Sequence, residues 1–127
     1  MPHRILIAEA DPESRRMLET YLAGNLGYEV VSAESGQAAI DAAMDGRFDL
    51  CILDVGLEDL NGAEAHARLR VLQPGLETIF LTRPDGDEWT RDFLRFSIPP
   101  ERVLTKPLRE LSGLTRLIVG ILGPPVG

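Results

Sequence analysis

The chain has 127 residues, with 20 acidic and 13 basic side chains and a formal net charge of −7. One domain of this length buries enough apolar surface to fold without disulfides or a structural metal. The acidic balance argues against a general nucleic-acid binder and against docking on anionic membranes, and the single cysteine, Cys51, excludes an intramolecular disulfide and a cysteine-cluster zinc site.

Five short runs rich in β-branched and aliphatic residues are predicted to form strands. In chain order they cover residues 4–8, 28–32, 50–53, 78–81 and 103–105. Most of them lack polar alternation, which is typical of a parallel sheet that is buried on both faces. No apolar run is long enough for an export signal or a membrane span, so we expect a cytoplasmic location.

Five helices are predicted between and after these strands from apolar residues at helical spacing. The first three have start signals at Asp11–Pro12, at Ser35 and at Asn61 with Glu64. Their stop signals are Gly24, Gly46 and Pro74–Gly75. A fourth helix is predicted from Trp89, Phe93 and Phe96, and a fifth from the leucines and isoleucines between Leu108 and Leu122.

Strands that alternate with helices predict an α/β domain with a doubly wound (βα)5 arrangement. Such a domain is a three-layer sandwich, with helices on both faces of a five-stranded parallel sheet. We expect the domain to cover residues 1–123, with a C-terminal tail over residues 124–127. In sheets of this kind, chemistry gathers beyond the carboxyl ends of the strands.

Polar side chains follow the predicted strands at those ends: Glu9 and Asp11, then Asp54, Thr82 and Lys106. Crowded carboxylates repel one another unless a cation lies between them, and a lysine or Mg²⁺ supplies that cation. The set suits phosphoryl transfer to a carboxylate. Asp54 would be the nucleophile that forms an aspartyl phosphate, while Mg²⁺, Lys106 and Thr82 hold the phosphoryl oxygens.

At these residues the chain resembles the receiver domain of two-component response regulators, over essentially its whole length. The matching segments are residues 5–12, 49–55, 61–62, 81–82 and 105–107. The resemblance implies the flavodoxin-like receiver fold, with Asp54 as phosphoacceptor and Thr82 as switch hydroxyl. It also implies that Lys106 contacts the phosphoryl group and that its peptide bond to Pro107 can be cis.

A Mg²⁺ site is a further implication of the resemblance, with Glu9, Asp54 and the backbone carbonyl of Gly56 as ligands. The family places two adjacent acids after the first strand, and here Ala10 stands at the second position. Asp11, one residue further on, is a doubtful substitute because its position suits a helix cap. We therefore expect weak Mg²⁺ binding and slow phosphorylation.

Three other positions depart from the family pattern. Val103 stands where an aromatic ring usually turns inward with the switch hydroxyl, and Glu58 stands near a common loop proline. Arg83 follows Thr82, where the family favours a small residue. That arginine is placed either to cover the rim of the pocket or to supply a cation in place of Mg²⁺.

Two functions remain open at this point. In the first, a sensor histidine kinase or phosphotransfer protein donates to Asp54, and the new dianion switches an interaction surface in a phosphorelay. In the second, the chain is a pseudo-receiver that binds partners without phosphorylation, which Ala10 and Val103 favour.

A small enzyme or a flavin binder is a third possibility on the same architecture. It has no support from a glycine-rich phosphate loop, a nucleophile elbow or a catalytic histidine. We expect no enzyme activity beyond self-catalysed transfer to Asp54, and no direct contact with nucleic acid or membranes. The surplus apolar face of the last helix favours a partner surface or a homodimer.

Overall fold

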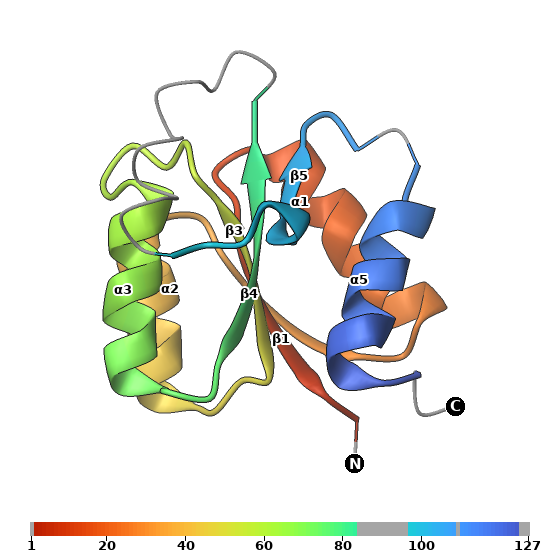
Figure 1. Ribbon diagram of the computed structural model, residues 1–127, viewed down its shortest axis with the longest axis horizontal. Helices are drawn as coiled ribbons and strands as arrows, with labels where there is room; N and C mark the ends of the chain where they lie inside the picture. The colour runs from red at the N-terminus through yellow and green to blue at the C-terminus, as the bar shows by residue number, and fades with distance from the viewer. Residues whose placement is uncertain (1, 84–96, 109, 125–127) are drawn as a thin grey trace.

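The computed structural model describes residues 2–83, 97–108 and 110–124. Its strands form one five-stranded sheet in the order β2-β1-β3-β4-β5, and every pairing is parallel (Figure 1). The strands are β1 (Arg4–Ala8), β2 (Glu29–Ala33), β3 (Leu50–Asp54), β4 (Glu77–Thr82) and β5 (Val103–Thr105). The predicted doubly wound parallel sheet is confirmed, with β2 one residue later than expected.

The described α-helices are α1 (Pro12–Glu19), α2 (Gly36–Asp45), α3 (Gly62–Leu72) and α5 (Ser112–Leu122). A π-helical segment, η1 (Thr20–Asn25), continues α1, and a short 3₁₀ turn, η3 (Pro100–Arg102), precedes β5. The predicted caps are present: the side chains of Asp11, Ser35 and Asn61 each accept a hydrogen bond from the backbone N–H three residues later. The helix predicted from Trp89, Phe93 and Phe96 lies outside the described residues.

Two helix boundaries differ from the predictions. The first helical stretch runs past Gly24 to Asn25, and the chain turns at Gly27, whose φ of 76° lies in the left-handed region that glycine favours. The last helix begins at Ser112, so Leu108 and Leu111 precede it. Both leucines pack against the same apolar cluster as α5, which explains why their spacing looked helical.

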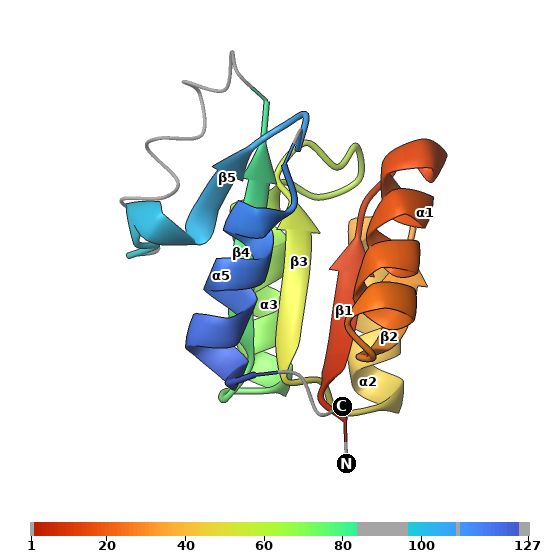
Figure 2. The same ribbon diagram turned by 90° about the vertical axis from the view of Figure 1, so that its right-hand side faces the viewer.

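The sheet is covered on both faces, with α1 and α5 on one side and α2 and α3 on the other (Figures 1 and 2). Alternate residues of each strand enter opposite cores: Leu6 and Leu53 face α2 and α3, whereas Ile7 and Ile52 face α1 and α5. Cys51 is fully buried in the first of these cores, as its apolar strand predicted. The three-layer arrangement is therefore confirmed.

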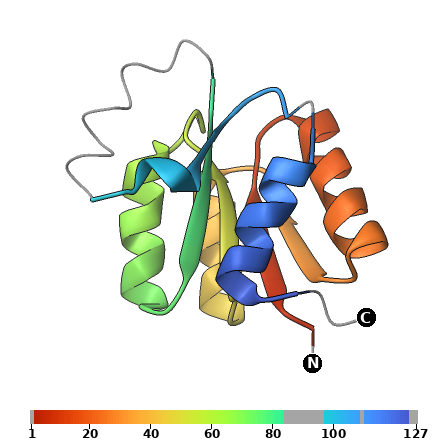
Figure 3. The same cartoon turned by 45° about the vertical axis from the view of Figure 1, so that its right-hand side comes forward.

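On the second face, α1 with η1 and α5 lie side by side (Figure 3). The hydroxyls of Tyr21 and Thr115 are 2.6 Å apart and join the two segments. In contrast, Met44 and Leu72, which helical spacing had placed with inward residues, are 70% and 42% exposed. Both lie in the last turn of their helices and line an open hollow at the amino end of the sheet. Across the described stretches of chain, no helix has the length and apolar character needed to cross a membrane.

Candidate functional site

The carboxyl ends of β1 and β3 bring two acidic residues together. The strands are direct neighbours in register Ala8 with Leu53, so Glu9 and Asp54 follow at the same edge. β1 leads outward to β2 while β3 leads to β4, which makes this edge the topological switch point of the sheet (Figure 2). Both acids are buried, with Glu9 fully covered and Asp54 3% exposed.

Lys106 follows the edge strand β5 and reaches these two carboxylates from there. Its ammonium Nζ donates to Glu9 Oε1 at 2.5 Å and to Asp54 Oδ2 at 3.1 Å. β4 separates β5 from β3, and the Lys106 backbone N–H is fixed to the carbonyl of Thr82 at 2.6 Å. The long lysine side chain therefore crosses over β4. It brings Lys106 into one polar cluster with Glu9, 97 positions earlier in the chain, and with Asp54, 52 positions earlier.

The pKa values in this cluster move in different directions. Burial, followed by the hydrogen bond with Asp54, raises the pKa of Glu9 to about 7 against the opposing effect of Lys106. Burial also acts to raise the pKa of Asp54, but hydrogen bonds with Glu9, the Gly56 N–H and Lys106 outweigh it, so this pKa is lowered. Burial likewise opposes the charge of Lys106, yet both carboxylates raise its pKa. The two carboxyl groups therefore differ, and the pKa of Asp54 is the lower of the pair.

Two of the predicted site residues make other contacts. The Thr82 side chain lies at the neighbouring strand end, where its hydroxyl donates to the backbone carbonyl of Arg83 at 3.4 Å. The exposed carboxylate of Asp11 accepts the Ser14 N–H at 2.9 Å as the cap of α1, and this bond lowers its pKa. The Asp11 side chain therefore caps the helix, while the Asp11 backbone N–H lies 3.5 Å from Glu9 Oε2.

Sequence reasoning missed Arg15. Its guanidinium donates to the backbone carbonyls of Glu9 at 2.8 Å and Ala10 at 3.3 Å, and so fixes the loop between β1 and α1. The only available signal was a basic residue one turn inside the helix after Asp11. The Lys106–Pro107 peptide bond is cis, in agreement with the resemblance.

The acidic side chains at this edge are the candidate ligands for Mg²⁺. Among the described side chains, no group of three or more His, Cys, Asp and Glu residues is arranged to hold a metal. Mg²⁺ accepts one or two carboxylates and completes its shell with water and phosphate oxygens. The two buried carboxylates of Glu9 and Asp54 therefore fit the ion, with no third acid because Ala10 has no ligand atom.

Comparison with known proteins agrees with this geometry. A family model for the response regulator receiver domain matches residues 5–117. The chain is similar to the transcriptional regulatory protein GlrR of Escherichia coli (strain K12), with 32% identity over 81 residues. That match covers 64% of this chain and 18% of GlrR, so the chain spans less than a fifth of that relative.

Two solved structures are similar over nearly the whole chain. The receiver domain of sensor histidine kinase PA1611 from Pseudomonas aeruginosa, which has a magnesium ion coordinated in its active site cleft, is 26% identical with a TM-score of 0.82, and the match covers 97% of this chain and 99% of that one. Response regulator TrrA from Thermotoga maritima, in complex with Mg²⁺ and BeF, is 25% identical with a TM-score of 0.79, covering 96% and 100% of the two chains. The chain therefore belongs to the response regulator receiver domain family.

Proposed function

We propose that Asp54 accepts a phosphoryl group from the phosphohistidine of a sensor histidine kinase or a phosphotransfer protein. The observation that supports this role is the buried carboxylate of Asp54, 3.1 Å from the ammonium of Lys106 at the switch point of the sheet. A desolvated carboxylate with a lowered pKa is available as a nucleophile at neutral pH.

The chemical step is an in-line exchange of one bond. A carboxylate oxygen of Asp54 forms the new O–P bond while the N–P bond of phosphohistidine breaks. The imidazole nitrogen keeps the electron pair of the broken bond and takes up a proton from water. Lys106 holds the negative charge beside Asp54, and the Gly56 N–H, 2.9 Å from Asp54 Oδ1, orients the carboxylate. The domain is then an acceptor that transfers the group to itself, not an enzyme for a free substrate.

Glu9, Asp54 and the backbone carbonyl of Gly56 would hold Mg²⁺ in this role. A divalent ion held there would supply positive charge for the phosphoryl oxygens. Ala10 removes a carboxylate from the set, so binding is weak. Ala10→Asp should tighten Mg²⁺ binding roughly tenfold, because ligand charge sets the affinity for hard divalent ions. Calorimetric titration measures this change, and an unaltered affinity would contradict the role assigned to position 10.

The direct test of the phosphoacceptor is intact-mass spectrometry after incubation with acetyl phosphate and Mg²⁺. The wild-type chain should gain one phosphoryl group, and Asp54→Asn should gain none. Asp49→Asn is the matched control, since Asp49 immediately precedes β3, at the end of that strand opposite to Asp54. If the wild type gains no more mass than Asp54→Asn, phosphorylation is excluded.

A pseudo-receiver is the second candidate, and four observations favour it. Ala10 supplies no ligand, Lys106 already bridges both carboxylates, and the Thr82 hydroxyl is bonded to the Arg83 carbonyl. Val103, at the start of β5, also lacks the ring that follows a switch hydroxyl in the family. This candidate predicts that partner binding is the same for the wild type and Asp54→Asn.

The signalling role implies a cytoplasmic location and protein partners, without direct contact to nucleic acid or membranes. A homodimer through α5 stays a prediction: Leu117, Ile121 and Leu122 are only partly buried against the sheet. Sedimentation velocity of the wild type and Leu117→Glu would test it, because a charge in an apolar dimer interface dissociates the dimer.

A further inference from the structure

Arg83 lies beside the open side of the Asp54 carboxylate. A methyl group placed on Gly56 would lie 3.4 Å from Asp54 Oδ1 and 3.8 Å from Arg83 Nε. One small volume above Gly56 therefore borders both the carboxylate oxygen and the guanidinium. Gly56 has no side chain to fill it, and apart from its chain neighbours no other described residue has an atom within 4 Å of that point.

Lys106 and Arg83 lie on the sides of different oxygens of Asp54. Lys106 donates to Oδ2, while Oδ1 faces the Gly56 N–H and the side where Arg83 lies. Lys106 is also committed to Glu9. Among the described residues, Arg83 has no carboxylate within ion-pair distance. Of the cations that the structure describes beside Asp54, its guanidinium is thus the one without a carboxylate partner.

Phosphorylation changes the charge balance that these cations must meet. It converts the singly charged carboxylate of Asp54 into an acyl phosphate that carries close to two negative charges at neutral pH. The added charge forms in a cluster that already holds Glu9, and position 10 is Ala, where the family has an acid. A guanidinium balances one negative charge, and its planar donors match two oxygens of a phosphoryl group.

We propose that Arg83 holds the phosphoryl group on Asp54 across the open space above Gly56, and so partly replaces Mg²⁺ in this receiver. This inference rests on the proposed phosphorylation of Asp54. Arg83 contacts the phosphoryl oxygens from the Oδ1 side while Lys106 holds the carboxylate from the Oδ2 side. It forms no covalent bond and moves no proton, so the transfer step itself is unchanged.

The test measures how strongly phosphorylation depends on Mg²⁺ in the presence and absence of the guanidinium. Initial rates of mass gain with acetyl phosphate are compared in EDTA and in saturating Mg²⁺, for the wild type and Arg83→Gln. Arg47→Gln is the control, because it removes the same charge from an exposed position at the amino end of the sheet. Arg83→Lys keeps the charge without the paired donors.

Arg83→Gln should lower the rate in EDTA by about tenfold or more, as loss of a preorganised donor does, and by much less in saturating Mg²⁺. Arg47→Gln should match the wild type in both buffers, and Arg83→Lys should recover part of the rate in EDTA. As an equilibrium readout, ¹⁹F NMR in EDTA should show bound beryllofluoride for the wild type and a reduced signal for Arg83→Gln.

Two results would overturn the inference, and they differ from each other. If Arg83→Gln equals Arg47→Gln in EDTA while both gain mass at Asp54, Arg83 does not hold the phosphoryl group and the phosphoacceptor stands. If the wild type gains no mass at Asp54 with or without Mg²⁺, the inference falls together with the proposed function. Gly56→Ala adds a steric check, since its methyl group would enter the space between Asp54 and Arg83 and should reproduce the metal dependence of Arg83→Gln.

Discussion

Charged side chains gather at both ends of the sheet, but they are buried at one end and exposed at the other. At the carboxyl end, the side chains of Glu9, Asp54 and Lys106 are 1%, 4% and 18% exposed. At the amino end, those of Arg4 and Glu29 are 37% and 61% exposed. Exposed ion pairs contribute little to stability, whereas buried charges carry a large desolvation cost. The buried cluster therefore points to chemistry and the exposed pairs do not.

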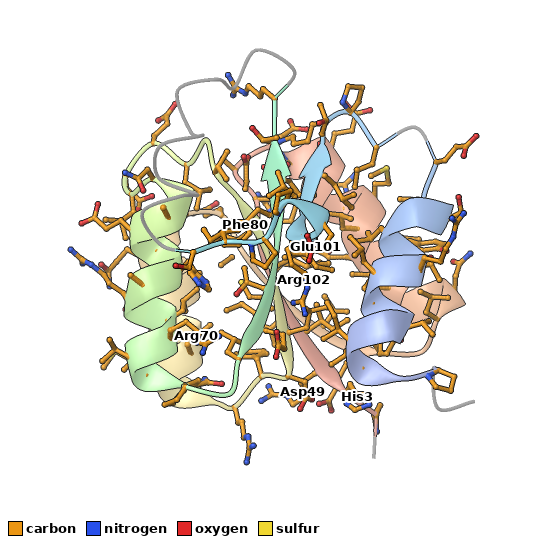
Figure 4. All side chains as sticks on the ribbon, in the orientation of Figure 1. His3, Asp49, Arg70, Phe80, Glu101 and Arg102 are labelled. Atoms are coloured by element: carbon orange, nitrogen blue, oxygen red, sulfur yellow. The ribbon has the colours of Figure 1, made fainter. Side chains whose placement is uncertain are left out.

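The amino end uses its polar groups to join segments of the chain. The Arg4 backbone N–H donates to Asp49 Oδ2 at 2.9 Å, its guanidinium donates to the Arg47 carbonyl at 2.7 Å, and the same group stacks on Phe48 at 4.7 Å from the ring centre. His3 and Asp49 lie together at this end (Figure 4), with 3.6 Å between His3 Nδ1 and Asp49 Oδ2. These contacts tie β1 to the loop before β3.

The largest expected effect comes from removing the cation at each end. Lys106→Met leaves two buried carboxylates without a cation, so the free energy of unfolding should fall by about 3 kcal/mol at neutral pH. Arg4→Met makes the same change at the exposed end and should cost about 1 kcal/mol or less. Urea denaturation in EDTA measures both, and equal losses would remove the distinction between the two ends.

The next effect tests how tightly the carboxyl end is packed. A methyl group on Gly62, at the start of α3, would lie 2.6 Å from Val55 Cα in the loop that follows Asp54. Gly62→Ala should therefore destabilise the fold by about 2 kcal/mol and shift this loop. Gly120→Ala in α5 meets nothing within 4 Å and should stabilise by about 0.5–1 kcal/mol. Thermal unfolding measures both changes. A shift of the two melting temperatures in the same direction would contradict this prediction.

A smaller effect is expected from a neutral side chain at the amino end. The Gln73 amide accepts the Phe48 N–H at 2.9 Å and donates to the carbonyls of Ala43 and Gly46 at 2.9 and 2.8 Å. Gln73→Ala should lower the free energy of unfolding by about 1.5 kcal/mol, because it leaves part-buried backbone groups without partners. Gln37→Ala, whose side chain bonds only Asp41 at the surface among the described residues, should leave stability nearly unchanged.

The smallest expected effect is a pH dependence of stability that comes from His66 on α3. Burial, followed by the charge of Arg70, lowers the pKa of His66, which contacts Thr78 Oγ1 at 3.1 Å and the edge of Phe80. The folded state thus favours neutral His66. The neutral imidazole contributes to the free energy of unfolding at pH values above the unfolded pKa of about 6.5. Stability is lost as pH falls below that value toward the lower folded pKa, because the unfolded chain binds the proton more readily. His66→Gln should flatten this part of the stability profile between pH 5 and 7.

Local patterns in the sequence determined the strands, the helix caps and the order of the elements. Asp11, Ser35 and Asn61 bond to N–H groups three residues away, so their roles follow from neighbouring residues alone. A parallel sheet brings the ends of its strands to one edge, which is why the sequence placed Glu9, Asp54 and Lys106 in one region.

Only the tertiary structure decided how those groups are paired. The bridge of Lys106 to both carboxylates joins residues up to 97 positions apart, and no spacing in the sequence encodes which oxygen the ammonium meets. The same holds for Arg15 on the loop carbonyls and for Arg83 beside Gly56. A long side chain has several possible partners within reach. Which contact forms depends on how distant segments of the chain pack together.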